Sequence, residues 1–169
     1  MTVLADYDIR QRALTQGLVT PFHHRRVDGG LSWGLSSCGY DVRLAGGLTE
    51  LDGTALPDMI LPVGRMVLGA TIERFNIPRD LCAHMRDKSS LIRRGLMLGN
   101  TVAEPGWQGF LTLELTNLSG APMELFEGMP IGQFQFELLS RSVDTPYSGK
   151  YQYQEAGPQV ARFEALVKR

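Results

Sequence analysis

The sequence predicts a mainly β fold, with an all-β sandwich or barrel-like core and short helices. Short stretches of alternating apolar and polar residues recur along the chain, which is the pattern of half-buried strands. Turn signals separate them: 19 glycines and 9 prolines make up about a sixth of the 169 residues, above the usual roughly 12%. Hydrophobic residues at 43% and charged residues at 21% are ordinary for a soluble globular protein. At about 100–200 residues per domain, this length predicts one domain over residues 1–169.

The first expected element is a helix near the N-terminus. Asp6 or Asp8 is expected to cap its start, and Gly17 marks its end. The residues expected to share its buried face are Ile9, Ala13 and Leu14.

Strands are expected after this helix. Residues 21–37 are rich in glycine, serine and basic residues and are expected to form a loop with one short strand. In residues 65–73 the alternation places Met66, Leu68, Ala70 and Ile72 on one face. The other expected strands are residues 39–44, 110–116, 123–126 and 131–139. From Arg141 the alternation stops, so residues from about 141 to 169 are expected to form an extended tail.

Charge, targeting signals and cysteines exclude several classes of function. Seventeen Lys and Arg against 18 Asp and Glu leave a net charge of −1, so no global basic field indicates nucleic acid or an anionic membrane as partner. No signal-peptide pattern is visible, and no stretch approaches the ~18 apolar residues of a membrane span. Cys38 and Cys82 form no CxxC pair and are expected to be buried thiols in a reducing compartment, which predicts a cytoplasmic protein. With only three histidines besides, the chain offers few ligands for a metal.

Residues 86–95, RDKSSLIRRG, form the first candidate functional segment. The serine pair and the later glycine predict a single helical turn with a capped start and a glycine stop. Backbone N–H groups at such a start, together with the serine hydroxyls and Lys88, can bind phosphate. Ser89 and Arg93 stand at i and i+4 and project from the same face. The alternative is a capped surface turn whose charges are solvated.

Residues 104–117, EPGWQGFLTLELTN, form the second candidate segment. Leu111, Leu113 and Leu115 are expected on one face of a strand, and Glu114 lies between two threonines on the other. Such a carboxylate can be solvated and inert. If its face is buried, it must find partners or hold a proton, and either state suits a general acid or base.

Residues 146–154, PYSGKYQYQ, form the third candidate segment. They combine aromatic and amide side chains with one lysine and contain no aliphatic residue, so they are not expected to be core. Two interpretations remain open: a loose terminus, or a flap whose Lys150 closes on an anion.

Together these segments resemble the dCTP deaminases, which are relatives of the trimeric dUTPases. The resemblance covers nearly the whole chain through six motifs, which in order are CGYDVRL, LGATIERFNIPRDL, DKSSLIRRGL, EPGWQGFLTLELTN, EGMPIGQ and YSGKYQ. It implies a dUTPase-like subunit, a distorted, mostly antiparallel β-barrel or jelly roll, that forms a homotrimer with active sites between subunits. It further implies dCTP or dUTP as the nucleotide, Mg²⁺ held mainly by the triphosphate, and feedback inhibition by dTTP.

The resemblance also assigns roles to individual residues. Glu114 matches the catalytic glutamate, while Ser89 and Arg93 would help to place the attacking water. Lys88 stands where the family usually has arginine, which replaces a bidentate fork with a point charge. The residues that the resemblance implies for substrate binding are Lys88, Ser89, Ser90, Arg93, Thr101, Val102, Glu104, Tyr147, Lys150 and Gln154. The last three belong to the tail that would close over the triphosphate.

The implied reaction is hydrolytic deamination at C4 of the cytosine, without zinc. Glu114 would take a proton from water and pass protons to N3 and to the leaving amine. Zinc deaminases need H-x-E and P-C-x-x-C motifs to hold the metal and the acid/base. The sequence has neither motif, which sets a zinc mechanism aside.

Two positions bear on the main alternative, a dUTP diphosphatase or a bifunctional enzyme that releases dUMP and pyrophosphate. Where dUTPases have an aspartate, this chain has Glu104, one methylene longer, and an ångström matters in near-attack geometry. Ten residues on, where deaminases carry glutamate, it has Glu114, which favours the deaminase. Residues 95–104 are shorter than in the common deaminases, so a modified pyrimidine is a further alternative substrate. A non-catalytic nucleotide-binding protein on the same scaffold is the last alternative, and Glu114 and Lys150 of the tail count against it.

Overall fold

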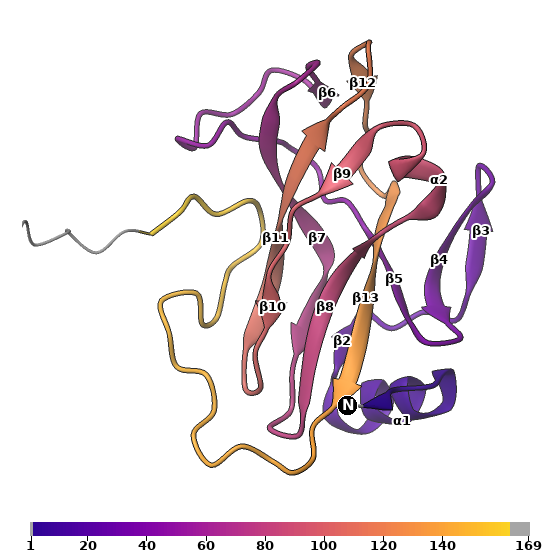
Figure 1. The fold of residues 1–169 in the computed structure, drawn as a ribbon, viewed down its shortest axis with the longest axis vertical. Helices are drawn as coiled ribbons and strands as arrows, with labels where there is room; N and C mark the ends of the chain where they lie inside the picture. The colour runs from indigo at the N-terminus through magenta and orange to yellow at the C-terminus, as the bar shows by residue number, and fades with distance from the viewer. Residues whose placement is uncertain (1, 163–169) are drawn as a thin grey trace, which may run out of the picture.

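Two curled β-sheets form the body of the molecule in the computed structural model, which describes residues 2–162 (Figure 1). The seven-stranded sheet contains β1 (Thr2–Val3), β3 (Arg26–Asp28), β4 (Leu31–Ser36), β5 (Gly39–Arg43), β8 (Leu81–Asp87), β10 (Val102–Ala103) and β13 (Pro130–Leu138). The four-stranded sheet contains β2 (Val19–Thr20), β7 (Met66–Asn76), β9 (Leu96–Leu98) and β11 (Gln108–Asn117). A small ribbon pairs β6 (Ile60–Leu61) with β12 (Met123–Glu124). Two helices, α1 (Asp6–Gln16) and α2 (Ser89–Ile92), complete the fold.

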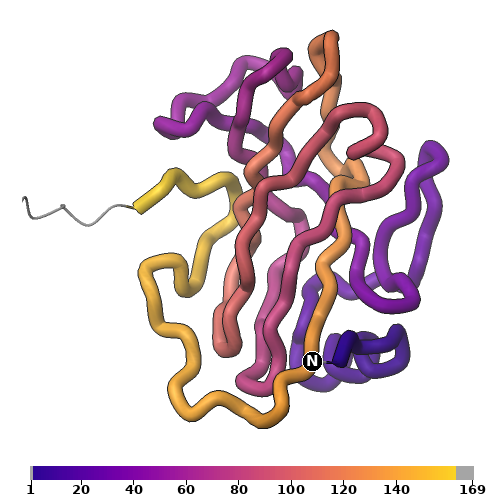
Figure 2. The backbone as a smooth tube through the Cα atoms, in the orientation of Figure 1, coloured from indigo at the N-terminus to yellow at the C-terminus, as the bar shows by residue number. Residues whose placement is uncertain are grey.

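The pairings between strands in residues 2–162 are all antiparallel. The larger sheet runs β10-β8-β13-β5-β4-β3, with β1 on β13, and the smaller runs β2-β7-β11-β9. The backbone path therefore crosses repeatedly from one sheet to the other (Figure 2). This confirms the predicted mainly β fold with mostly antiparallel strands and short helices.

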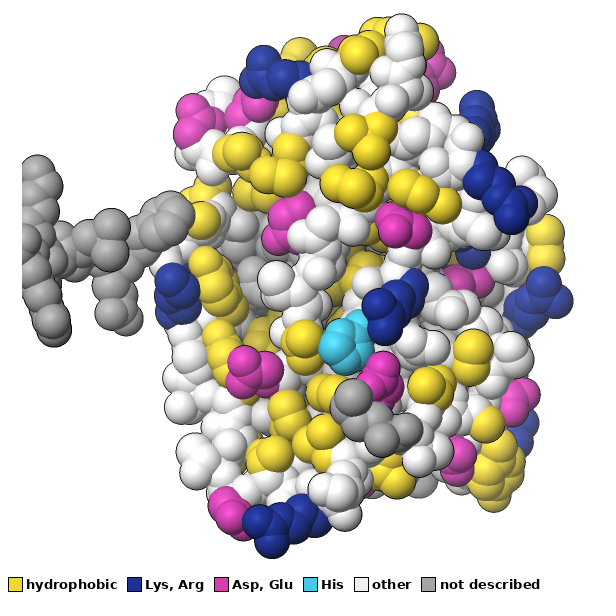
Figure 3. Space-filling model, in the orientation of Figure 1, with side chains coloured by type: hydrophobic (Ala, Val, Ile, Leu, Met, Phe, Trp, Pro, Cys, Tyr) yellow, Lys and Arg dark blue, Asp and Glu magenta, His cyan; other side chains and the backbone are white. Residues whose placement is uncertain are grey.

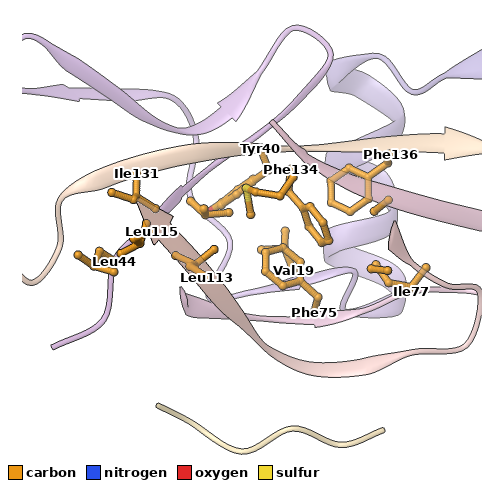
Figure 4. Close-up of a cluster of buried hydrophobic side chains, with 14 of the residues drawn as sticks. Val19, Tyr40, Leu44, Phe75, Ile77, Leu113, Leu115, Ile131, Phe134 and Phe136 are labelled. Carbon is orange, nitrogen blue, oxygen red and sulfur yellow. The ribbon is translucent and has the colours of Figure 1, made fainter. Parts of the chain in front are cut away.

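The core lies between the two sheets, because each turns apolar side chains toward the other (Figure 4). Phe75 of β7 meets Phe134 of β13 edge-on, with ring centroids 4.5 Å apart. Leu113 and Leu115 of β11 are fully buried against this cluster. Because β11 buries its leucine face, its other face is free to carry polar side chains.

Helix α1 forms where expected but differs at its start and along its face. Ala5 occupies the N-cap position without a side-chain cap, while Asp6 lies inside the helix and its Oδ1 accepts the Tyr7 N–H, so the predicted aspartate cap is wrong. Ile9 and Ala13, spaced at i and i+4, are buried, whereas Leu14 is 66% exposed, contrary to prediction. Gly17 ends the helix in the left-handed conformation, as predicted.

Several strands also depart from expectation. Residues 26–36 form a hairpin of two strands, β3 and β4, rather than a loop with one. β7 lies between β2 and β11 and buries residues of both faces: Thr71 and Glu73 are buried although they stand opposite the predicted apolar face. Met66, which was predicted to lie on that apolar face, is exposed.

The chain beyond β13 forms no strand as far as residue 162 and folds back along the molecule, next to β11 (Figure 1). A parallel bridge joins Gln154 to Gly109 at the start of β11. The rest of the predicted tail, residues 163–169, lies outside the described residues.

Membrane span and cysteine environment bear on the remaining expectations. Within residues 2–162, neither helix is long and apolar enough to cross a bilayer. Both cysteines are free, and Cys82 is buried as predicted. Cys38 is exposed in the turn between β4 and β5, which corrects the prediction that both thiols are buried.

Candidate active site

Glu114 lies in the middle of β11, opposite Leu68 of β7. Its side chain is half-buried, and the Oε2 atom is buried without any hydrogen-bond partner. Burial raises the pKa of this carboxyl, and hydrogen bonds from its own backbone and from the Asn100 amide partly oppose the rise. Burial on this face therefore makes the charged form of the Glu114 carboxyl less favourable than that of a solvated carboxyl.

Residues 99–100 cover Glu114 from the neighbouring chain segment. The Gly99 N–H donates to the Glu114 carbonyl at 2.9 Å, and the Asn100 Nδ2 donates to the Thr112 carbonyl at 2.8 Å. The Asn100 Oδ1 is buried without a partner, like the Glu114 Oε2. Two unpaired acceptors thus lie in the same part of the molecule, and buried polar atoms of this kind need a donor.

The two residues that follow Asn100 are both predicted substrate-binding positions. Thr101 and Val102 are exposed, and Val102 lies on β10 opposite His84 of β8. Asn100 lies in the loop that the sequence singled out, but its role there was missed. An amide directly after Gly99 in a short loop was the available signal.

Helix α2 carries the predicted phosphate-binding residues on a single turn. Ser89, Ser90 and Arg93 are all exposed. The predicted serine cap is wrong: Lys88 occupies the N-cap position without a side-chain cap, and Ser89 is the first helical residue. Gly95 ends the turn as predicted, with φ at 93° and the backbone of Ser119 too close to admit a Cβ.

Lys88 does not extend freely into solvent, because it forms a buried ion pair. Its Nζ lies 2.9 Å from the Asp41 Oδ2 and donates to the Ser32 Oγ at 3.1 Å. Asp41 also accepts from the Ser32 hydroxyl and from the Gln133 amide. Sequence reasoning missed Asp41, although a carboxylate inside the apolar strand GYDVRL was a signal that a cation must lie nearby.

The cavity beside this ion pair has a volume of about 470 Å³ and is strongly polar. Its walls include Arg25, Ser32, Asp41, Lys88, Ser89 and Gln133. Glu114 does not line it. Within one chain, therefore, the structure brings Lys88 and Ser89 into one cavity and leaves Glu114 outside it.

The tail binds to the start of β11 through backbone and amide hydrogen bonds. The Trp107 Nε1 donates to the Tyr151 carbonyl at 2.7 Å, and the Phe110 N–H donates to the Gln154 carbonyl at 3.1 Å. The Gln154 Nε2 contacts the Thr112 Oγ1 at 3.2 Å, on the same strand and two residues from Glu114. Gln154 is thus close to Glu114 along β11.

The other predicted site residues, Tyr147, Lys150 and Glu104, lie on the tail and on the turn before β11. Tyr147 lines a separate cavity with Gly106 and Gln152, and its N–H donates to the Pro105 carbonyl. The Lys150 ammonium contacts the Arg162 carbonyl and lies 5.3 Å from the centre of the Tyr151 ring. Glu104 is exposed on the turn before β11.

One further buried charge pair supports the scaffold rather than the site. Glu73 of β7 is fully buried and accepts from the Arg43 Nε at 2.8 Å and from the Arg43 N–H at 2.9 Å. The guanidinium of Arg43 also stacks on the Trp33 ring at 4.3 Å. These contacts link β5 of one sheet to β7 of the other.

Solved structures show to which fold class this chain belongs. A crystal structure of 2′-deoxycytidine 5′-triphosphate deaminase from Agrobacterium tumefaciens superposes with a TM-score of 0.62 at 19% identity. The alignment covers 80% of this chain and 47% of that chain, so this chain spans about half of that one. The native EIAV dUTPase superposes with a TM-score of 0.50 at 18% identity, covering 66% of this chain and 84% of that one. The fold is therefore dUTPase-like, as the sequence predicts.

Sequence comparison narrows this class to one family. A family model described as dCTP deaminase-like matches residues 3–139. A dCTP deaminase of Anaplasma phagocytophilum strain HZ is 36% identical over 89% of this chain and 94% of the relative. One of Acidiphilium cryptum strain JF-5 is 33% identical over 91% of this chain and 96% of the relative. The chain belongs to the dCTP deaminase-like family.

Proposed function

We propose that the protein deaminates dCTP to dUTP and ammonia by direct hydrolysis. Membership of the dCTP deaminase-like family and relatives named dCTP deaminase support this substrate and reaction. The observation that carries the proposal is the buried, unpaired Oε2 of Glu114, on a strand that Gly99 and Asn100 cover. A carboxyl with a raised pKa in such a place suits the transfer of protons to and from a substrate.

The chemistry assigned to Glu114 is proton transfer. Water adds its oxygen to C4 of the cytosine ring while Glu114 takes one of its protons and delivers it to N3. Glu114 then takes the proton of the added C4 hydroxyl and passes it to the amino group. The C4–N bond breaks, ammonia leaves, and the carbonyl of uracil remains. The raised pKa helps the carboxyl to accept the proton from water near neutral pH. No step requires zinc.

The phosphates are assigned to the cavity beside α2. Of the predicted phosphate-binding residues, Ser89 lines this cavity with a hydroxyl and Lys88 with a charge that it shares with Asp41. Ser90 and Arg93 are exposed on the same turn, outside the lining of the cavity. The carboxylates of the cavity are engaged by the protein, since Asp41 pairs with Lys88 and Asp87 accepts the Leu98 N–H at 2.8 Å. This fits a Mg²⁺ ion that is held by the triphosphate rather than by side chains.

The active unit is proposed to be a homotrimer with sites between subunits. Glu114 lies outside the cavity that Lys88 and Ser89 line, so a nucleotide in contact with both groups is best served by two chains. Thr101 and Val102 are exposed and so available to the base, while Tyr147, Lys150 and Gln154 of the tail would cover the triphosphate. Feedback inhibition by dTTP and a cytoplasmic location stay predictions of the sequence.

A pair of glutamine variants tests the proposal, with ammonia and pyrophosphate measured separately from dCTP and dUTP. Glu114→Gln should abolish ammonia release while nucleotide binding persists, because the amide cannot carry the proton. Glu124→Gln, at an exposed position on β12, is the matched control and should keep full turnover. Normal ammonia release by Glu114→Gln would overturn the assigned role. Pyrophosphate from dUTP that disappears in Glu104→Gln, without ammonia from dCTP, would favour the diphosphatase instead.

A further inference from the structure

Three side chains with metal-binding atoms converge on the outer face of the seven-stranded sheet. Along β8, Leu81, Ala83 and Met85 face the core, so the alternating residues Cys82 and His84 face outward. Glu137 of β13 stands directly opposite Cys82 and diagonal to His84. Figure 3 shows this face, with a histidine between acidic and basic side chains over β8, β10 and β13.

The three ligand atoms of this group lie near one another, somewhat farther apart than a bound metal ion would hold them. The Cys82 Sγ lies 4.0 Å from the His84 Nε2, which lies 3.9 Å from the Glu137 Oε1, and the three atoms are all within 4.8 Å of one another. The Cys82–His84 contact is at the outer limit of a hydrogen bond to sulfur, and the His84–Glu137 distance exceeds the about 2.7–3.2 Å of an ordinary N–H···O hydrogen bond. Tetrahedral Zn²⁺, with ligand bonds of about 2.0–2.3 Å, holds such atoms about 3.3–3.6 Å apart. Small side-chain rotations would bring the three atoms onto one ion.

We propose that Cys82, His84 and Glu137 bind one Zn²⁺ ion, which joins β8 to β13 and leaves a fourth position open. A thiolate, an imidazole and a carboxylate are ligands that zinc accepts together, whereas Mg²⁺ and Ca²⁺ prefer sets of oxygen ligands. The Cys82 thiol gives its proton to solvent as the ion binds. The site is separate from Glu114, which lies on the other sheet, so the zinc-free deamination proposed above does not depend on it.

Arg86 is a cation on this face that would compete with the ion for Glu137. Its Nη2 lies 4.0 Å from the Glu137 Oε1, and its Nε donates to the Gln135 side chain at 3.3 Å. The Arg86 side chain is 55% exposed, so it can move into solvent when a divalent ion takes its place beside Glu137. The carboxylate is only 12% exposed and would keep a positive partner in both states.

Cobalt is the probe for this site, because Co²⁺ bound by a thiolate absorbs in the near ultraviolet and shows ligand-field bands in the visible. The full-length protein is freed of metal with a chelator, titrated with Co²⁺ and then with Zn²⁺ or Mg²⁺. The wild type should bind one Co²⁺ per chain with the thiolate band, and Zn²⁺ but not Mg²⁺ should displace it. Zn²⁺ should also raise the thermal midpoint of the wild type, because it binds only the folded chain at this site.

Variants of the two cysteines decide whether the site is the one proposed. Cys82→Ser should lose the thiolate band, while Cys38→Ser, which removes the exposed thiol, should retain it. His84→Gln, at a half-buried position, should weaken Co²⁺ binding more than about tenfold, because even the loss of a group that only hydrogen-bonds to a metal ligand weakens binding by about that much. This variant keeps the test valid if Cys82→Ser does not fold. A missing band in the wild type, an unchanged band in Cys82→Ser, or a band lost in Cys38→Ser would overturn the proposal.

Discussion

Glu114→Gln is expected to stabilise the protein while it removes the proposed catalytic group. The wild-type carboxyl leaves its Oε2 buried without a partner, and burial raises its pKa. An amide carries no charge, so it is buried at a lower cost than a carboxylate. It also brings an N–H donor into a part of the molecule where the Asn100 Oδ1 lacks a partner. A site that sacrifices stability to hold a reactive carboxyl should gain stability when that carboxyl is neutralised.

The magnitude follows from the unpaired oxygen. A buried polar atom without a partner costs about 1–3 kcal/mol. Because Glu114 is only half-buried, solvent screens part of its charge and the lower end of that range applies. About 1 kcal/mol corresponds to a rise of about 2–4 °C in the thermal midpoint for a chain of this size.

The sign of the pH dependence is fixed by the raised pKa. The folded chain holds the Glu114 proton more tightly than the unfolded chain does. The wild type therefore becomes less stable as the pH rises from the ordinary glutamate pKa of 4.5 through the raised pKa of the folded chain. The advantage of Glu114→Gln should therefore be small near about pH 5 and larger near about pH 8.

The assay is thermal unfolding of the wild type, Glu114→Gln and Glu124→Gln at these two pH values. The exposed control Glu124→Gln should stay within about 0.5 kcal/mol of the wild type at both. The reasoning is refuted if Glu114→Gln is less stable than the wild type at the higher pH, or if its advantage does not change with pH.

Three further predictions concern the ion pair, the tail and the assembly. Lys88→Met should lower the free energy of unfolding by about 3–5 kcal/mol in chemical denaturation, because it leaves Asp41 buried without its cation. The control Arg65→Met removes the exposed ion pair with Glu50 and should lower it by less than about 1 kcal/mol. Equal losses in the two variants would contradict this prediction. Gly109→Ala should make the tail sensitive to protease, because φ is 149° at Gly109 and a Cβ there would lie 2.7 Å from the Gln154 nitrogen. The control Gly120→Ala has open space around its Cβ and should leave the tail protected. A protected tail in Gly109→Ala would contradict the proposed importance of the contact between Gln154 and the start of β11. Mixing equal amounts of inactive Ser89→Ala and Glu114→Gln chains should restore about a quarter of the activity, if each site of the trimer takes Ser89 from one chain and Glu114 from the next. No recovery of activity would place both residues of a site in one chain.

Local patterns predicted the strands and the helix because those elements depend on near neighbours. The alternation in residues 110–116 and 131–139 corresponds to β11 and β13, and Gly17 ends α1 as its backbone freedom suggested. The hairpin of residues 26–36 was not recognised because its glycines and serines resemble a loop, although the Arg43 and Arg26 side chains pack on Trp33 there.

Contacts between distant parts of the chain could not be predicted in the same way. The sequence alone suggests that Lys88 is a free cation, because its partner Asp41 lies 47 residues away along the chain and only the fold brings the two together. Glu73 reads as an exposed strand residue until Arg43 covers it from the other sheet. Asn100 has a role only because β11 brings Thr112 and Glu114 beside its loop. The identities of the candidate residues were readable from motifs, but their partners required the three-dimensional structure.

Separate measurement of ammonia and pyrophosphate from dCTP tests the central claim most directly. The purified protein with dCTP and Mg²⁺ should release ammonia in step with dUTP and form no pyrophosphate. Pyrophosphate from dUTP, with no ammonia from dCTP, would contradict the account.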